Sequence, residues 1–98
     1  MSAGELTVDL RGRPMETLSD FRDAVREPCG LPERHGRNLD AWSDTINTRG
    51  ISEVIDSHDS LVVHVDERGL FDGSRREGRL LADTFDAPQN RLVVHITA

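Results

Sequence analysis

The sequence predicts an α/β fold in which a small three-stranded parallel sheet is flanked by three to four helices. Two continuous apolar runs, residues 61–65 and 92–96, are typical of strands that are buried on both faces of a parallel sheet. A third run, residues 5–10, alternates polar and apolar residues and indicates another strand. Segments with helical spacing separate these runs, so the expected order is β-α-α-β-α-β. Parallel strands joined by right-handed helical crossovers are the usual solution for this order.

The first helix is expected to begin near Thr17 or Ser19, either of which can cap its start. Asp20 would lie in its first turn, where a carboxylate is favoured by the helix dipole. The apolar face recurs at helical spacing at Leu18, Phe21 and Val25. Pro28 and Gly30 are expected to end this helix.

A second helix is expected over residues 38–49, directly after a loop over residues 30–37. Its core face is formed by residues spaced three and four apart, Leu39, Trp42 and Ile46. At about 100° per residue, Asp40, Asp44 and Asn47 form a separate polar face of the same helix.

A further helix is predicted between the two apolar runs. Gly50 closes the second helix, and residues 51–55 can add a short extra turn. Residues 66–73 are rich in turn formers and are expected to be exposed. Ser74 and Glu77 have the spacing of a capping box, which would open the next helix. The apolar stripe of that helix is Leu80, Leu81 and Phe85.

The charge balance argues against a nucleic-acid ligand. The 98 residues include 18 acidic and 12 basic side chains, all of the latter arginine, and the net charge is −6. A general nucleic-acid binder should be basic, because phosphate neutralisation drives its affinity. Acidity often serves solubility alone, but it also suits a basic partner. With 36% hydrophobic residues, residues 1–98 are expected to form one domain with one modest core.

Targeting signals and cysteine usage indicate the expected compartment. Residues 1–5 lack the basic start and apolar run of a signal peptide. No segment approaches the ~20 apolar residues that are needed to span a bilayer. Cys29 is the single cysteine, so an internal disulfide is impossible and a zinc cluster is not expected. We therefore expect a soluble cytoplasmic protein with an inert Cys29, no membrane contact and no cofactor.

Residues 31–44 carry most of the functional information in the chain. A loop marked by Pro32 and Gly36 runs straight into the second helix, which starts with Asp40 and Asp44. Residues at positions i and i+4 share one helix face, so the two carboxylates are expected to project together. Such a rigidly mounted anionic surface suits capture of a cationic pocket on another molecule better than it suits catalysis.

Several identities in this segment form a recognisable pattern. They are Leu31-Pro32-Glu33, Gly36, Asn38-Leu39-Asp40-Ala41 and Asp44. The pattern resembles the signature of the barstar family, intracellular inhibitors of secreted microbial ribonucleases of the barnase type. The resemblance is strongest over residues 19–46, and the element order agrees with the family's three-stranded parallel sheet. It implies a ribonuclease inhibitor with no catalytic residue, metal or cofactor, acting as a monomer in a one-to-one complex.

The resemblance also implies roles for individual residues. Asp44 matches the aspartate that enters the ribonuclease active site and takes the place of the substrate phosphate. Asp40 matches a second carboxylate, which contacts the enzyme near its base-recognition loop. Gly36 matches a glycine that lets the loop dock, and Asn38 matches a position that shapes the loop–helix junction. Asp83 is the expected counterpart of an acidic contact on the third long helix.

The chain departs from the family at the rim of the expected binding surface. Arg34 and His35 stand where family members typically carry aromatic residues. Ser43 stands at the position of a family tryptophan, whereas Trp42 lies one place earlier. One helical residue turns a side chain by about 100°, so Trp42 is expected to pack inward. Arg34, His35 and Ser43 complete the expected partner-binding set and indicate a ribonuclease with a different recognition rim.

Other functions stay open on the sequence. A barstar-like immunity or protein-interaction module directed at a different toxin is the main alternative. Paired carboxylates beside His35 could serve general acid–base chemistry in a small hydrolase. His35, Asp40 and Asp44 also offer mixed nitrogen and oxygen ligands to a metal ion. No nucleophile motif or glycine-rich phosphate cradle accompanies them, so an inhibitor is favoured. His64 and His95 lie within the apolar runs and are interpreted as structural.

Overall fold

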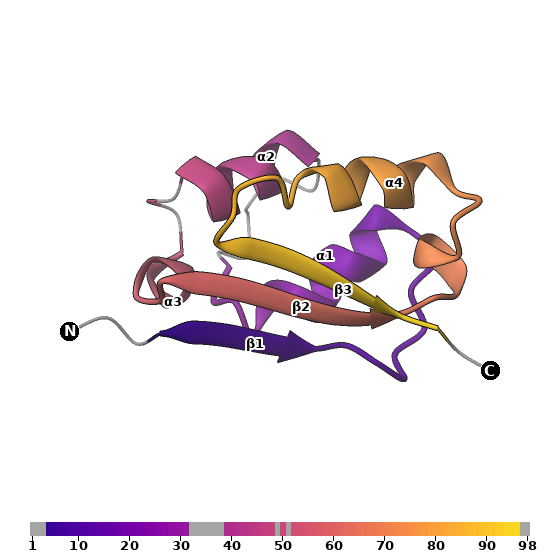
Figure 1. Ribbon diagram of the computed structural model, residues 1–98, viewed down its shortest axis with the longest axis horizontal. Coiled ribbons are helices and arrows are strands. Elements are labelled where there is room, and N and C mark those ends of the chain that lie inside the picture. The colour runs from indigo at the N-terminus through magenta and orange to yellow at the C-terminus, as the bar shows by residue number, and fades with distance from the viewer. Residues whose placement is uncertain (1–3, 32–38, 49, 51, 97–98) are drawn as a thin grey trace.

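The computed structural model describes residues 4–31, 39–48, 50 and 52–96. The strands are β1 (Glu5–Asp9), β2 (Ser60–Asp66) and β3 (Asn90–His95). The helical segments are α1 (Leu18–Arg26), α2 (Leu39–Ser43), the π-helical η1 (Asp44–Thr48), α3 (Glu53–Asp56), the 3₁₀ turn η2 (Gly69–Phe71) and α4 (Arg76–Asp83). All strand pairs are parallel, in the order β1-β2-β3 (Figure 1). The predicted three-stranded parallel sheet flanked by helices is confirmed. No helix within the described ranges is long and apolar enough to cross a membrane.

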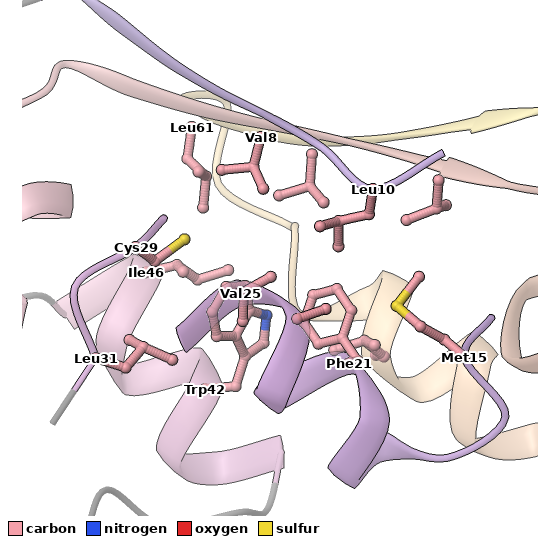
Figure 2. Close-up of a cluster of buried hydrophobic side chains, with 14 of the residues drawn as sticks. Val8, Leu10, Met15, Phe21, Val25, Cys29, Leu31, Trp42, Ile46 and Leu61 are labelled. Atoms are coloured by element: carbon pink, nitrogen blue, oxygen red, sulfur yellow. The ribbon is translucent and has the colours of Figure 1, made fainter. Parts of the chain in front are cut away.

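The core lies between one face of the sheet and helices α1, α2 and α4 (Figures 1 and 2). Alternate residues of the first two strands point into it and are at most 3% exposed, namely Val8, Leu61, Val63 and Val65. The helices contribute Phe21, Val25, Trp42, Ile46 and Leu81. The rings of Phe21 and Trp42 meet edge to face with centroids 5.2 Å apart, as favoured by aromatic quadrupoles. The predicted core face of the second helix is therefore confirmed.

The other face of the sheet carries mainly polar side chains, and we call it the outer face. Its members alternate with the core residues and include Thr7, Asp9, Val62, His64, Asp66, Arg91, Val93 and His95. All of these are exposed or half-buried except Val62, which is 5% exposed. The expectation that both apolar runs are buried on both faces is thus wrong for β3. This strand is an edge of the sheet, and its Val94 is 39% exposed.

The structure decides between the two residues that the sequence offered as the N-cap of helix α1. Thr17, not Ser19, is the N-cap, and its hydroxyl accepts a hydrogen bond from the Asp20 backbone N–H at 3.1 Å. The Asp20 carboxylate accepts from the backbone N–H groups of Glu16 and Thr17 at 3.0 and 3.2 Å. These two residues therefore form a capping box. The bond from the Glu16 N–H is the main reason why the pKa of Asp20 lies below its ordinary value.

One continuous α-helix was expected over residues 38–49, but the structure has two helical segments there. The α-helical turn of α2 gives way at Asp44 to the π-helical turn η1. The Thr45 hydroxyl donates to the Ala41 carbonyl at 2.8 Å, and Asn90 Nδ2 donates to the Ile46 carbonyl at 3.0 Å. Side-chain bonds of this kind compete with the regular backbone ladder. Residues 38 and 49 lie outside the described part of the chain.

Helix α4 starts without the predicted capping box. The N-cap position is Arg75, which makes no side-chain capping bond. The Ser74 hydroxyl and backbone N–H both donate to Asp72 Oδ1, at 2.6 and 2.7 Å, so the serine closes its own turn instead. The Ser74 hydroxyl therefore bonds to Asp72 instead of capping α4.

The segment between β2 and α4 is only partly exposed, contrary to the expectation for residues 66–73. Leu70 and Phe71 in η2 are 1% and 6% exposed and belong to the core. Gly78 of α4 sits directly above this turn, where an added Cβ would overlap the Leu70 carbonyl oxygen. A glycine inside the helix lowers intrinsic helix stability, and here it allows α4 to approach η2 closely.

Candidate partner-binding face

The two predicted carboxylates lie on the solvent side of one short helical segment. Asp40 is on α2, Asp44 is the first residue of η1, and both are exposed. The intervening turn is α-helical, so the spacing that predicts a shared face is kept as far as Asp44. On the core side, Trp42 is 6% and Ile46 is 0% exposed. The segment is therefore anchored by its apolar side while its acidic side remains accessible.

Trp42 packs inward, as its shifted position in the sequence predicts. Its ring lies 5.2 Å from that of Phe21 and 5.9 Å from that of Phe85, measured between centroids. Its Nε1–H is buried without a hydrogen-bond partner among the described residues. Trp42 thus joins α2, which carries Asp40, to Phe21 of α1 (Figure 2) and to Phe85 in the chain after α4.

Asn47 does not belong to the polar face that was predicted for it. It is half-buried, and its Nδ2 donates to Ser43 Oγ at 3.1 Å and to the Thr84 carbonyl at 2.9 Å. Its Oδ1 accepts from Asn90 Nδ2 at 2.8 Å. Asn90, which is 2% exposed, also donates to the Ile46 carbonyl. We call Asn47 and Asn90 the amide pair, because together they tie η1 to the end of α4 and the start of β3.

The amide pair also relates Asp83 to the acidic segment. Asp83 is the last residue of α4, is exposed, and directly precedes Thr84, whose carbonyl accepts from Asn47. Figure 1 shows α2 and α4 following one another along the same side of the molecule. Ser43 is half-buried, and its hydroxyl is already used by Asn47. The structure therefore places Asp44 and Asp83 on elements that are linked by the bond from Asn47 to Thr84, a contact that the sequence did not predict.

The remaining predicted contacts lie outside the described residues. They are Arg34, His35, Gly36 and Asn38. The amide pair gives no signal in the sequence, since Asn47 fits a polar helix face and Asn90 simply precedes an apolar run. Only the tertiary fold shows that these two amides meet.

The described residues give the site little chemistry beyond charge. Within the described ranges, no group of three or more histidine, cysteine, aspartate or glutamate side chains is arranged to hold a metal ion. The buried Cys29 thiol has its pKa raised by burial to about 12, so little thiolate forms near neutral pH. This agrees with the expectation of an inert Cys29. What the site presents is an exposed set of carboxylates on a buried support.

Comparison with known proteins extends the resemblance beyond the loop and second helix. A protein-family model described as Barstar (barnase inhibitor) matches residues 5–92, which include all of β1, α1, β2 and α4. None of the curated proteins that were compared matches the chain. The family match covers nearly the whole chain and agrees with the parallel sheet and helix order described above. The chain therefore belongs to the barstar family.

Proposed function

We propose that this chain inhibits a secreted, guanyl-preferring microbial ribonuclease of the barnase type by covering the enzyme's active site. The observation that carries the proposal is the exposed pair Asp40 and Asp44 on a helical segment whose opposite side is buried through Trp42 and Ile46. The family's description as a barnase inhibitor supports the same reading. In this proposal residues 1–98 form the inhibitory unit, which binds the enzyme as a monomer in a one-to-one complex in the cytoplasm.

The physical reason is complementarity of charge. A ribonuclease must hold cationic groups around the phosphate of its substrate, and a fixed carboxylate can occupy the same place. Charged groups arranged in this way give specificity and fast association. A side chain on a rigid support also loses less conformational entropy on binding. Inhibition would then be steric and electrostatic, with no bond made or broken in the inhibitor.

Each site residue has a place in this proposal. Asp44 enters the active site in place of the phosphate, and Asp40 binds near the base-recognition loop. Asp83, on the neighbouring α4, adds a further acidic contact. The rest of the partner-binding set comes from the loop and its junction with α2, namely Arg34, His35, Gly36 and Asn38, and from Ser43 at the end of α2.

A second candidate is an immunity module that neutralises a different toxin. It is favoured by the rim, because Arg34, His35 and Ser43 replace the aromatic residues that family members carry there. A changed rim selects a changed partner, since specificity is a difference between affinities for alternative partners.

Titration of ribonuclease activity with the purified chain tests the first proposal. The activity of a guanyl-preferring, barnase-type ribonuclease should fall linearly and reach its endpoint near one inhibitor per enzyme. The matched control is Asp44→Asn, which keeps the side-chain shape and removes the charge. Undiminished activity at large excess, across several such ribonucleases, would contradict the proposal. Neutralisation of another toxin by the same protein would then establish the alternative.

A further inference from the structure

Strands β2 and β3 bring two histidines together on the outer face of the sheet. His64 Nδ1 and His95 Nε2 lie 2.8 Å apart, and the ring centroids are 5.0 Å apart with the planes inclined at 31°. Both side chains are half-buried. In the parallel register, His95 is opposite Asp66, two residues beyond His64. Sequence reasoning interpreted both histidines as structural and did not predict that they meet.

The histidine pair is separate from the partner-binding face. The neighbours of His64 on its own strand, Val63 and Val65, are fully buried and point into the core. Because side chains alternate along a strand, His64 points to the opposite side of the sheet. Segments α2 and η1 pack on the core side through Trp42 and Ile46. The sheet therefore lies between the two sites.

The short contact between His64 Nδ1 and His95 Nε2 limits where the two rings can carry their hydrogens. A neutral imidazole carries one N–H donor and one nitrogen lone pair, so a single hydrogen must lie between His64 Nδ1 and His95 Nε2. When each ring carries its hydrogen on its other nitrogen, both facing nitrogens present lone pairs to the same region. Neutral imidazole nitrogens of this kind are ligands for zinc, copper, iron and nickel.

The separation of the two nitrogens discriminates between coordination geometries. Metal–imidazole bonds are about 2.0–2.1 Å long. If one ion bound both nitrogens at their 2.8 Å separation, the nitrogen–metal–nitrogen angle would therefore be about 85°. Neighbouring ligands in square-planar and octahedral sites subtend about 90°, whereas those in a tetrahedral zinc site subtend about 109°. The pair is thus spaced for the tetragonal geometry that Cu²⁺ and Ni²⁺ prefer.

We propose that His64 and His95 form a two-histidine binding site for Cu²⁺ or Ni²⁺ on the outer face of the sheet. Two ligands come from the protein and water completes the coordination, in keeping with the lack of larger ligand clusters within the described ranges. Asp9 lies opposite His64 and Asp66 opposite His95 in the strand register. These carboxylates favour a cation nearby, although Arg11 offsets part of the charge through its 2.8 Å ion pair with Asp9.

Metal binding at this site is coupled to folding. The two ligands come from different strands and meet only when β2 and β3 are paired. An ion that binds the folded state but not the unfolded chain stabilises the folded state by mass action. Cu²⁺ or Ni²⁺ should therefore raise the thermal unfolding temperature in proportion to the logarithm of its concentration, once the ion exceeds its dissociation constant.

Calorimetric titration of the protein without a histidine tag, using CuSO₄ or NiCl₂ in a non-chelating buffer, tests the proposal. One ion should bind per chain, and electron paramagnetic resonance of the Cu²⁺ complex should show coupling to two nitrogens. In His64→Asn and His95→Gln, an amide replaces each facing nitrogen and can keep the interstrand hydrogen bond. Since losing only an outer-sphere partner costs about 10–100-fold in metal affinity, each change should weaken binding at least about tenfold.

His58→Ala is the matched control. His58 Nδ1 contacts the Val54 carbonyl of α3 at 2.6 Å, so this histidine belongs to a different part of the fold. The control should bind Cu²⁺ and Ni²⁺ as the parent does and show the same rise in unfolding temperature. Lack of binding by the folded parent, or unchanged affinity in the His64→Asn/His95→Gln double variant, would overturn the site. Both readouts are independent of ribonuclease inhibition, so the two proposals stand or fall separately.

Discussion

The charge on Asp44 is expected to matter most at the scale of single residues. Asp44→Ala should weaken partner binding most and Asp40→Ala less, because only Asp44 is proposed to be buried against cationic catalytic groups. Truncating one member of a buried charge pair costs about 2–5 kcal/mol, a range to which the barnase–barstar pair itself contributes. Both side chains are exposed in the free protein, so folding should survive. Binding calorimetry on the two variants measures the difference, with circular dichroism as the folding control.

One result would remove the role of Asp44. If Asp44→Ala folds normally and binds within about 1 kcal/mol of the parent, it falls below the usual threshold for a binding hot spot. Arg34 and His35 would then become the leading anchors, and the rim of the surface, not its centre, would determine binding.

A second prediction at the residue scale concerns the amide pair. Asn90→Ala removes the donor to the Ile46 carbonyl and to Asn47 Oδ1. A buried polar group left without its partner costs about 1–3 kcal/mol, so the free energy of unfolding should fall by about this amount. Urea denaturation measures the loss. Arg91→Ala, one position later and exposed, is the matched control and should stay within about 0.5 kcal/mol of the parent. Equal effects of the two changes would contradict a structural role for the pair.

At the scale of elements, the capping box of α1 makes stability depend on pH. The pKa of Asp20 is lowered in the folded state, chiefly by the hydrogen bond from the Glu16 N–H. Its ionised form therefore contributes stability above the unfolded value of about 3.9, and that contribution is lost as the pH falls through the lower folded value. Asp20→Asn should reduce the free energy of unfolding at pH 7, and the deficit should shrink below about pH 4.

Denaturant titrations at several pH values test this expectation. Glu27→Gln, which removes an exposed carboxylate at the other end of the same helix, is the matched control. It should not reproduce the loss seen at pH 7, because a carboxylate near a helix C-terminus opposes the helix dipole. A deficit in Asp20→Asn that persists unchanged into acid would argue against the capping carboxylate as its cause.

Elements that depend on local pattern were predictable, and those that depend on distant contacts were not. The strands and α1 follow from apolar spacing, and Thr17 was one of the two residues expected to cap α1. The π-helical turn could not be predicted, because Asn90 reaches the Ile46 carbonyl across 44 positions of sequence. The predicted capping box at Ser74 is not formed, because the Ser74 hydroxyl donates to Asp72, two residues earlier.

The candidate site was predictable to a similar degree. The exposure of Asp40 and Asp44 and the inward packing of Trp42 follow from helical periodicity, and the structure confirms them. The inward turn of Asn47 depends on α4 and β3, which no pattern within the second helix encodes. The same is true of the histidine pair, since parallel register, not strand identity, brings the two rings together.

At the scale of the whole molecule, the net charge of −6 should steer the encounter with a cationic ribonuclease. Association rates measured by stopped flow should fall as ionic strength rises toward ~0.5 M, where the Debye length is only about 4 Å. Glu5→Gln, which removes an exposed charge on β1, serves as a control for charge alone. It should slow association less than Asp44→Asn does. A rate that is indifferent to salt would contradict steering while leaving inhibition intact.

The parallel order β1-β2-β3 has a consequence for synthesis of the chain. The central strand of the sheet is also the middle strand in sequence, and the first strand pairs with it across 55 positions, Glu5 with Ser60. Contacts between residues so distant in sequence form slowly, because a long loop must close first. On the ribosome, the apolar sides of α1 and α2 have no sheet to cover until β2 has emerged. The nascent chain therefore carries uncovered apolar helices from the end of α1 at Arg26 until β2 ends at Asp66. This interval is when the chain would be most exposed to aggregation or to chaperone binding.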